Sequence, residues 1–219
     1  MRYEKNGIKI AVQKVGTHDI YLVRSEILIP LPLERVVLLY KVRATPRALH
    51  PPRGNAARVW LLALTVLGLL CVQHTPNWKA WMPDATFKEL ERVSERACVM
   101  LVSYRLPVVS NRDVCLFETS QQGKPWEERG SQQAAAACHT MFACSVEHPE
   151  CPKRRGWVRA QLRVSVTIFE PTPEGGTLIT SMQHSDPRGK VPVAAVNQML
   201  VRGKQQLKDM RKAMVEGKL

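Results

Sequence analysis

The chain of 219 residues is long enough for one large domain or two small ones, and a hydrophobic fraction of 45% is ordinary for a globular protein. This composition excludes wholesale disorder. The formal net charge of +13 indicates an anionic partner, either nucleic acid or an acidic membrane surface. Because the basic residues are spread along the chain and aromatic residues make up only 6%, a membrane-facing or solvated basic surface is favoured.

The N-terminal part contains two strand patterns and a helix pattern. Alternation over 8–12 and β-branched residues over 20–29 predict two strands, joined by a turn at 16–19. Residues 32–42 predict a short helix with a proline near its start. Because Met1 lies almost on the first strand pattern, we expect an upstream segment to be missing.

The cysteines and histidines raise the question of disulfides or a metal. No apolar stretch follows a basic N-terminus, so we expect no secretory signal and reduced thiols in a cytoplasmic protein. Cys138, His139, Cys144, His148 and Cys151 invite comparison with a zinc site. Their C-x5-C-x3-H-x2-C spacing is irregular, whereas structural zinc is usually held by paired C-x2-C knuckles. We therefore predict no metal and no cofactor.

The segment 43–75 has an unusual composition. Residues 43–58 are rich in Arg, Ala and Pro without an acidic residue, and residues 59–72 are almost wholly apolar. As a helix the apolar part would reach about 21 Å, short of the roughly 30 Å hydrocarbon core of a membrane. Two interpretations stay open: a buried or interfacial segment, or a segment foreign to a fold that continues across it.

The region from residue 84 onward predicts one helix followed by strands. Residues 84–95 suit a helix with Asp84 as its N-cap. Strand patterns follow at 97–105, 112–119 and 134–146, the last after a loop rich in Gly, Gln and Ser.

The clearest strand pattern covers 158–169, where apolar residues alternate with polar ones, including Ser165 and Thr167. Such alternation predicts an antiparallel strand with one dry face and one wet face. A turn at 171–176 and a strand at 177–184 complete a hairpin.

The C-terminus changes to helical spacing. Apolar residues and one glycine recur at steps of three and four, which forms one stripe along a helix. The stripe comprises Val193, Val196, Leu200, Gly203, Leu207, Met210 and Met214. Because the sheet is the large partner available to this stripe, an α+β architecture is predicted.

Three stretches carry a family resemblance. They are YRLPVVSNRDVCLFE at 104–118, CSVEHPECPKRRGWVRA at 144–160 and DPRGKVPVAAVN at 186–197. In order and spacing they resemble the START lipid-transfer domain family. The resemblance implies a helix-grip fold, in which a curved antiparallel sheet is wrapped around a long C-terminal helix. It treats residues 1–219 as a single domain that lacks the family's leading helices, with 43–75 as an atypical insertion.

The same resemblance implies a function. A START-like chain is expected to bind, and to transfer, a single lipid in an internal apolar cavity closed by the loop 147–157, and not to be an enzyme. The lipid would be of the sterol, phospholipid or sphingolipid class. The resemblance further implies a cytoplasmic monomer without nucleic acid, in transient peripheral contact with anionic membranes.

The resemblance also implies a set of lipid-contacting residues from the sheet and the last helix. They are Leu101, Ser103, Glu118, Met141, Ala143, Trp157, Ser181, Gln183, Val196, Leu200, Gly203 and Leu207. Glu118 is expected to accept a hydrogen bond from a head-group hydroxyl, or to be a solvated strand-end carboxylate. Trp157 is expected to anchor the covering loop, to touch membrane, or to pack in the core. Gly203 within a helix costs about 1 kcal/mol relative to alanine, which room for a ligand or close helix–sheet packing would offset.

Other functions stay open. Enzymes that act on bound apolar substrates also use the helix-grip fold, although no acid–base constellation stands out in this sequence. The net charge favours a nucleic-acid-binding protein, but Arg43, Arg47, Arg53 and Arg58 lie in the unusual segment 43–75, which weakens this reading. A third alternative is an interaction module in which residues 59–72 dock on a membrane or partner.

Overall fold

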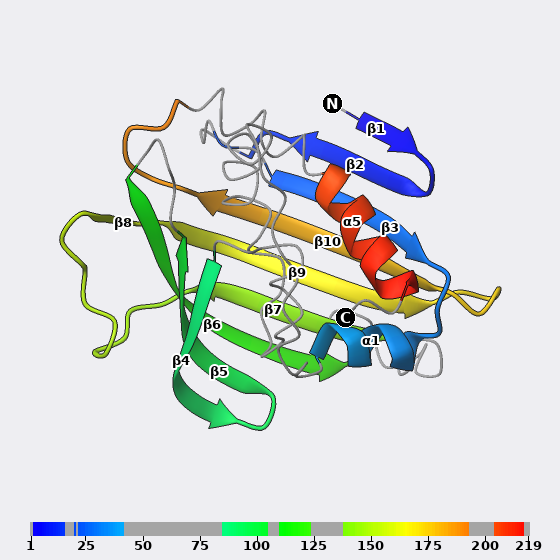
Figure 1. The fold of residues 1–219 in the computed structure, drawn as a ribbon, viewed down its shortest axis with the longest axis horizontal. Coiled ribbons are helices and arrows are strands. Elements are labelled where there is room, and N and C mark those ends of the chain that lie inside the picture. The colour runs from blue at the N-terminus through cyan, green and yellow to red at the C-terminus, as the bar shows by residue number, and fades with distance from the viewer. Residues whose placement is uncertain are drawn as a thin grey trace.

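The computed structural model describes residues 2–15, 20, 22–41, 85–104, 110–123, 138–192 and 204–216. These residues form a ten-stranded sheet and two helices (Figure 1). The strands are β1 Arg2–Lys5, β2 Ile8–Gln13, β3 Leu22–Ile29, β4 Ala85–Ser94, β5 Ala97–Tyr104, β6 Asn111–Gln122, β7 His139–Ser145, β8 Trp157–Arg159, β9 Gln161–Pro171 and β10 Thr177–Asp186. The helices are α1 Leu33–Lys41 and α5 Lys204–Val215.

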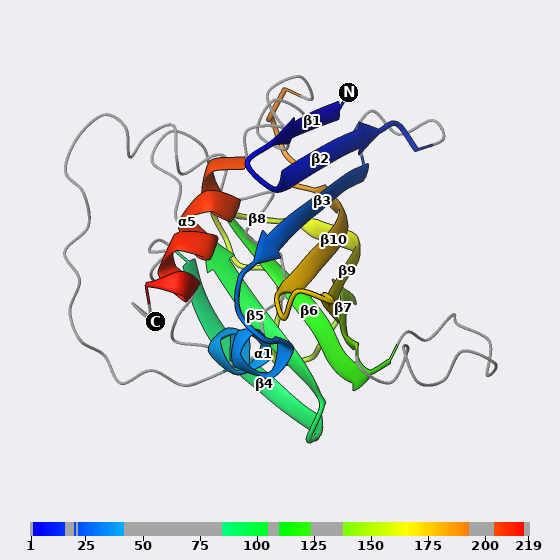
Figure 2. The same ribbon diagram turned by 90° about the vertical axis from the view of Figure 1, so that its right-hand side faces the viewer.

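The sheet follows the order β1-β2-β3-β10-β9-β7-β6-β5-β4, and β8 pairs with β6 in parallel off this path. The other pairs of described strands are antiparallel. Figures 1 and 2 show a strongly bent sheet with α5 lying across one side of it. We call the sheet face that packs against α5 the α5 face, and the opposite one the outer face. The α+β architecture predicted from the sequence is present, with the C-terminal helix described from Lys204 onward.

A tight hairpin joins the first two strands. Asn6 and Gly7 both have positive φ, 54° and 72°, which is typical of the two-residue turns that match the twist of paired strands. Asparagine and glycine adopt this conformation at the lowest cost. Strands β2 and β3 were predicted from the sequence, whereas β1, which pairs with β2, was not.

The predicted helix at 84–95 is wrong, because this stretch forms strand β4. The strand is the last in the sheet order and carries several charged residues with two register shifts, between Glu89 and Glu91 and between Arg92 and Ser94. Charged residues and bulges are typical of edge strands, since they discourage pairing with another chain. The charged residues have high helix propensity, which explains the wrong prediction. The packing of Ala85 and Phe87 against the second apolar cluster stabilises the strand instead.

The predicted division of strand 158–169 into a dry and a wet face is also wrong. The strand breaks at Ala160, whose amide donates to the Asp113 carbonyl at 2.8 Å, and resumes as β9. Val164 is 39% exposed, whereas Ser165 and Thr167 are each 1% exposed. The reason is that Ser165 and Thr167 lie on the same face as Ser181 and Gln183, which packs against α5, and that the register of β9 with β10 shifts between His184 and Ser185.

Two apolar clusters line the α5 face. The first joins β2, β3, β7, β9 and β10 to α1 and to Leu207, Met210 and Met214 of α5. The second joins β4, β5, β6 and β7 with Ala160 and Leu162. The helical stripe predicted at the C-terminus is therefore confirmed for its described residues, which are buried against the sheet.

Several predicted features lie outside the described residues. They are the segment 43–75, the turn at 16–19, and the stripe residues Val193, Val196, Leu200 and Gly203. Within the part of the chain that the structure describes, neither helix has the length and apolar character needed to cross a membrane.

Candidate functional site

Two rows of side chains cross the α5 face near its middle. Residues directly opposite each other in antiparallel strands share a face, so the pairings define the rows. The first row is Ser25, Ser181, Thr167, Met141 and Ser120, from β3 to β6. The second row, from the same strands, is Val23, Gln183, Ser165, Ala143 and Glu118. We call the polar members of both rows the polar band.

The polar band is buried but only partly hydrogen-bonded. The Thr167 and Ser181 hydroxyls lie 3.0 Å apart and bond to each other. In contrast, both polar atoms of the Gln183 amide and the Ser165 hydroxyl have no hydrogen-bond partner among the described residues. Gln183 is 2% exposed and Ser165 is 1% exposed. Leaving such a group buried and unpaired costs about 1–3 kcal/mol each, so a hydrogen-bond partner beyond the described residues is strongly favoured.

Apolar side chains enclose the polar band on both sides. The next row along the strands consists of Ile27, Ile179 and Phe169, which belong to the α5 cluster. On the other side lie Leu116 and Met100 of the second cluster. The arrangement combines a large apolar lining with a few convergent polar groups, which is typical of sites for small apolar ligands.

Five of the predicted site residues come together on this face: Glu118, Met141, Ala143, Ser181 and Gln183. A sixth, Leu207, reaches the same face from α5 and packs in the cluster that contains Met141.

The face predicted for Leu101 and Ser103 is wrong. They lie opposite Cys115 and Asp113 of β6, which have the other parity from Glu118. Both residues therefore lie on the outer face. The error arose because the parity of β5 depends on its register with β6, which the sequence of β5 alone does not contain.

Four members of the polar band were not predicted: Ser25, Ser120, Ser165 and Thr167. A usable signal was present for two of them. The hairpin turn after β9 sets Ser165 opposite Gln183 and Thr167 opposite Ser181. Because Ser181 and Gln183 were assigned to the cavity face, Ser165 and Thr167 should have been assigned to the same face.

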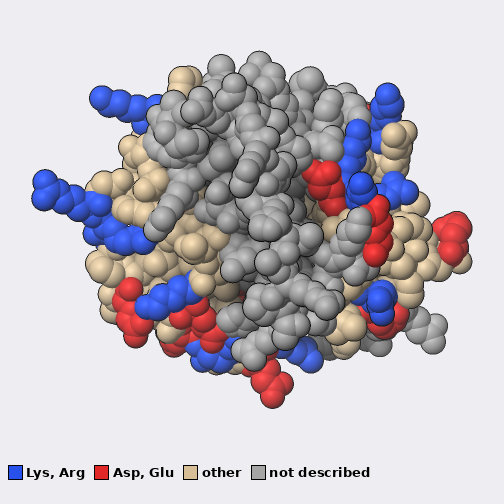
Figure 3. All heavy atoms as spheres, in the orientation of Figure 1, with Lys and Arg blue, Asp and Glu red and all other residues tan. Residues whose placement is uncertain are grey.

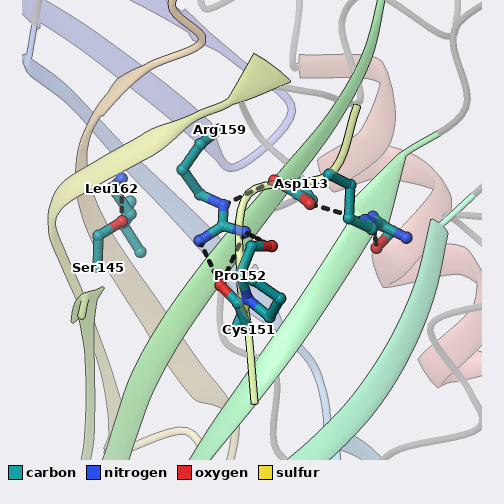
Figure 4. Close-up of polar contacts among 8 residues, drawn as sticks. Asp113, Ser145, Cys151, Pro152, Arg159 and Leu162 are labelled. Carbon is teal, nitrogen blue, oxygen red and sulfur yellow. Dashed lines mark hydrogen bonds and ion pairs between the residues drawn. The ribbon is translucent and has the colours of Figure 1, made fainter. Parts of the chain in front are cut away.

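A paired polar network occupies the outer face (Figure 4). Asp113, which is 1% exposed, accepts from Arg154 Nε at 3.0 Å and from Arg159 Nε at 2.7 Å. Arg159 also donates to the carbonyl oxygens of Cys151 and Pro152, at 3.2 Å each. Both carboxylate oxygens of Asp113 are thus bound by guanidinium groups, which is the arrangement that a buried charge requires.

This network holds the loop 147–157 against the outer face. Arg154 donates to Ser103 Oγ at 2.7 Å, and its guanidinium carbon lies 3.7 Å from the centroid of the Trp157 ring. Cys151 packs with Cys115 in a small apolar cluster on the same side. The expectation that this loop closes a cavity against the α5 face is therefore wrong. Trp157 lies where the loop is anchored, in contact with Arg154.

Burial also shifts the pKa values of two thiols and one guanidinium group near these faces. Burial raises the pKa of Cys115 to about 12, and the neighbouring Cys151 thiol contributes. On the α5 face, burial and the nearby Glu118 raise the pKa of Cys98 to about 11. Burial lowers the pKa of the Arg112 guanidinium, which donates to the carbonyls of Ser110 and Arg188. Raised thiol pKa values describe protonated side chains, not reactive nucleophiles.

The residues considered for zinc are divided between the two faces. His139 pairs with Phe169 and Gln122 on the α5 face, whereas Cys144 pairs with Phe117 on the outer face. Among the described residues, no group of three His, Cys, Asp or Glu side chains is placed to hold a metal ion.

Charged side chains are dispersed over the described surface in Figure 3, with lysines and arginines next to aspartates and glutamates. Exposed ion pairs such as Lys9–Glu4 and Arg92–Glu89 illustrate this mixing. On the face drawn, the described residues form no single basic strip of the kind that tracks a nucleic-acid backbone.

Comparison with known proteins identifies the fold and the family. Human StAR-related lipid transfer protein 5 superimposes with a TM-score of 0.68 at 20% identity, covering 99% of this chain and 86% of that one. Human STARD10 gives 0.67 at 20% identity, with coverage of 98% and 71%. The STAR-related lipid transfer protein (fragment 25-204) from Xanthomonas axonopodis gives 0.62 at 19% identity, with coverage of 98% and 97%.

A search of curated protein sequences finds no match to this chain. The family model described as START domain matches residues 71–216, which span strands β4 to β10, the polar band except Ser25, and helix α5. The chain therefore belongs to the START domain family, which is known for lipid binding and transfer.

Proposed function

We propose that this chain binds one lipid molecule in an internal apolar cavity between the α5 face and the C-terminal helix, and transfers it between membranes. The family and the apolar lining of the α5 face support this proposal. Enclosing a lipid is worth about 0.8 kcal/mol for each methylene removed from water, so a long chain or ring system supplies the binding energy. The polar band supplies orientation and selectivity.

The amide of Gln183, which is buried and has no hydrogen-bond partner among the described residues, carries this proposal. A face that served only for helix–sheet packing would gain stability from apolar side chains at this position, since a buried unpaired amide is costly. A ligand that hydrogen-bonds to Gln183 and to Ser165 offsets that cost when it is bound. The retained polarity is therefore better explained by ligand recognition than by packing.

The proposed contacts come from both layers. From the sheet they are Glu118, Met141, Ala143, Ser165, Thr167, Ser181 and Gln183. From the helix they are Leu207 and, along the same stripe, Val196, Leu200 and Gly203.

Native mass spectrometry with lipid extraction tests the proposal. The chain is purified with and without residues 43–75, and bound lipid is extracted and identified. A stoichiometric lipid in either form is the expected result. A folded protein that purifies empty and then takes up no member of a lipid panel would refute lipid binding. An insoluble full chain beside a soluble deletion variant would show that residues 43–75 are foreign to the domain.

We further propose that the protein is a cytoplasmic monomer that meets anionic membranes transiently. The net charge of +13 favours contact with acidic lipids, and such contact weakens as salt screens it. Flotation with phosphatidylserine-containing vesicles should recover more protein than flotation with neutral vesicles. The difference should shrink between about 0.05 M and about 0.5 M salt. Equal recovery on both vesicle types would contradict the membrane contact.

START domain proteins generally bind or transfer lipids and are not enzymes, and we propose the same for this chain. A helix-grip enzyme is the second candidate, since an enzyme could also use an apolar face that contains a buried carboxyl group, here that of Glu118. Recovery of a chemically altered lipid after incubation would favour that candidate.

A further inference from the structure

We infer that a basic patch at one end of the sheet is the surface with which the chain docks on an anionic membrane. The patch consists of four exposed side chains, Lys153, Arg155, Arg188 and Lys190. The inference rests on the proposed lipid transfer, because a protein that moves lipid between membranes must touch them. It deepens that proposal by naming the docking surface.

Two loops that are distant in the sequence meet beside β8. One leads into β8 and the other follows β10, and Figure 1 shows both at the same end of the sheet. Gly189 lies so close to Val158 of β8 that a Cβ atom on it would be 3.4 Å from the valine methyl groups. Arg112, which pairs with Val158, donates to the Arg188 carbonyl at 3.3 Å. The basic residues of the two loops therefore belong to one surface.

The loop before β8 presents its basic residues to solvent because the residue between them is held inward. The Arg154 guanidinium binds Asp113 at 3.0 Å and Ser103 at 2.7 Å on the outer face. Lys153 and Arg155, on either side of it, are exposed. Arg154 thus fixes the loop, and its two neighbours face away from the sheet.

The four side chains of the basic patch form no ion pair with an acidic side chain in the described part of the chain. Arg188 donates instead to the Gln161 amide oxygen at 2.7 Å, and the neighbouring Asp186 accepts from the Arg188 backbone amide. Other surface arginines are neutralised, as Arg24 is by Glu26 at 2.6 Å. The charge of the basic patch is therefore available to an anionic partner.

The acidic half of the same loop is directed elsewhere. The Glu150 backbone amide donates to His148 Nδ1 at 3.2 Å, and His148 Nε2 lies 3.1 Å from the Glu91 carboxylate of β4. These contacts tie the first half of the loop to the edge strand, whereas the basic half runs to β8. The segments 105–109 and 193–203, which adjoin the described residues here, contain no Asp or Glu in their sequence. None of these neighbours offsets the positive charge beside β8.

An anionic membrane is the partner that fits the basic patch. Each Lys or Arg near such a surface contributes enough free energy to strengthen partitioning roughly 5-fold. A nucleic-acid backbone is usually followed by a long basic groove, whereas this patch is confined to one end of the sheet. Trp157, which is partly buried against Arg154, adds an aromatic ring of the kind enriched at membrane interfaces.

The basic patch also lies close to the candidate site. Strand β10 continues for three residues from Gln183 of the polar band to its end at Asp186, which is about 10 Å at the rise of a strand. Docking through the patch would therefore bring this end of the α5 face towards the membrane, as delivery of a lipid requires.

Charge-matched variants test the inference. The patch variant combines Lys153→Gln with Arg155→Gln. The control combines Lys5→Gln with Lys9→Gln, which removes the same charge from the exposed β1–β2 hairpin on the opposite side of Figure 1. Flotation at low salt measures partitioning onto phosphatidylcholine vesicles with and without phosphatidylserine. With phosphatidylserine present, we expect the partition coefficient to fall at least about 10-fold in the patch variant and less than about 3-fold in the control. Thermal unfolding should be the same in both variants and the parent, because the substituted residues are exposed.

Three results would overturn the inference. Equal losses in the two variants would mean that the attraction comes from the overall charge and not from this patch. Undiminished vesicle binding by the patch variant would mean that another surface docks. If the parent binds poly(U) RNA more tightly than the phosphatidylserine vesicles, and the patch variant loses that binding, the patch belongs to a nucleic-acid partner.

The proposed function is measured separately on the same proteins. Native mass spectrometry counts bound lipid, which should be equal in the parent and both variants because the substituted residues lie outside the polar band. Loss of vesicle binding with unchanged lipid occupancy in the patch variant supports the inference. A parent that takes up no lipid refutes the proposed function, whereas the vesicle comparison still decides which surface docks.

Discussion

The two faces of the sheet use polar residues in opposite ways. On the outer face, Asp113 is buried and both of its oxygens are bound by arginines of the following loop and strand. On the α5 face, Gln183 is equally buried, and its amide has no partner within the described part of the chain. A saturated network stabilises the protein itself, whereas an open one stabilises the complex with something else. Pairing, more than burial, therefore distinguishes structural polar groups from ligand-binding ones on this sheet.

The largest effect is expected from breaking the outer network. Asp113→Ala leaves two guanidinium groups without their common carboxylate and releases the loop 147–157. Removing one partner of a buried ion pair costs about 3–5 kcal/mol of the unfolding free energy. Urea denaturation measures the loss. Lys9→Ala, which breaks the exposed pair with Glu4, is the control and should cost under about 1 kcal/mol. Similar losses in both variants would contradict the structural role of the network.

The next effect concerns the contact between α5 and the sheet. Leu207→Ala removes a buried side chain from the first apolar cluster and should lower the unfolding free energy by about 2–5 kcal/mol. Val215→Ala, at an exposed position of the same helix, should change it by under about 0.5 kcal/mol. Urea denaturation of both variants makes the comparison. If Leu207→Ala were as stable as the parent, the described end of α5 would not be packed on the sheet.

A matched pair of serines addresses the comparison directly. Ser103→Ala removes the acceptor of an Arg154 hydrogen bond on the outer face, and should lower the unfolding free energy by about 1 kcal/mol. Ser165→Ala removes a hydroxyl on the α5 face that has no partner in the described part of the chain, and should leave the lipid-free protein unchanged or up to about 1 kcal/mol more stable. Denaturation is measured after lipid extraction. Equal losses in the two variants would remove the distinction between the faces.

The most gradual effect is expected at alkaline pH. Burial raises the pKa of Cys98 to about 11 and that of Cys115 to about 12, while an unfolded thiol titrates near 8.5. The folded chain therefore holds these protons when the unfolded chain has lost them. The stability contribution is complete below about pH 8.5 and is lost progressively as pH rises through about pH 11. Urea denaturation at a series of pH values measures the slope, which should be shallower in Cys98→Ala. An identical slope in that variant would argue against a buried, protonated Cys98.

Many residues of the candidate site could be predicted from the sequence, but the face of the sheet on which each one lies could be predicted only in part. Glu118, Met141, Ala143, Ser181 and Gln183 were expected to share one face of the sheet, and the strand pairings place them on it. Their contact with a lipid stays a prediction. Leu101 and Ser103 were placed on the wrong face, since a strand shifted by one residue presents its opposite side. Ser165 and Thr167 were predicted to face solvent because they are polar. Polar side chains in a central strand can also line a buried ligand site, and this alternative was not considered.

The sequence by itself determined those strands and helices that have one apolar face and one polar face, because their residues alternate with the period of a strand or a helix. Strands β2, β3 and β10, helix α1 and the apolar stripe of α5 follow from alternation or from steps of three and four, which depend only on neighbours in the chain. Tertiary structure decided the rest. Position at the sheet edge made β4 a strand despite its helix-favouring charges, and the pairing of Asp113 with Arg154 and Arg159 placed the loop 147–157 on the outer face. These outcomes depend on partners distant in sequence, so no local pattern contains them.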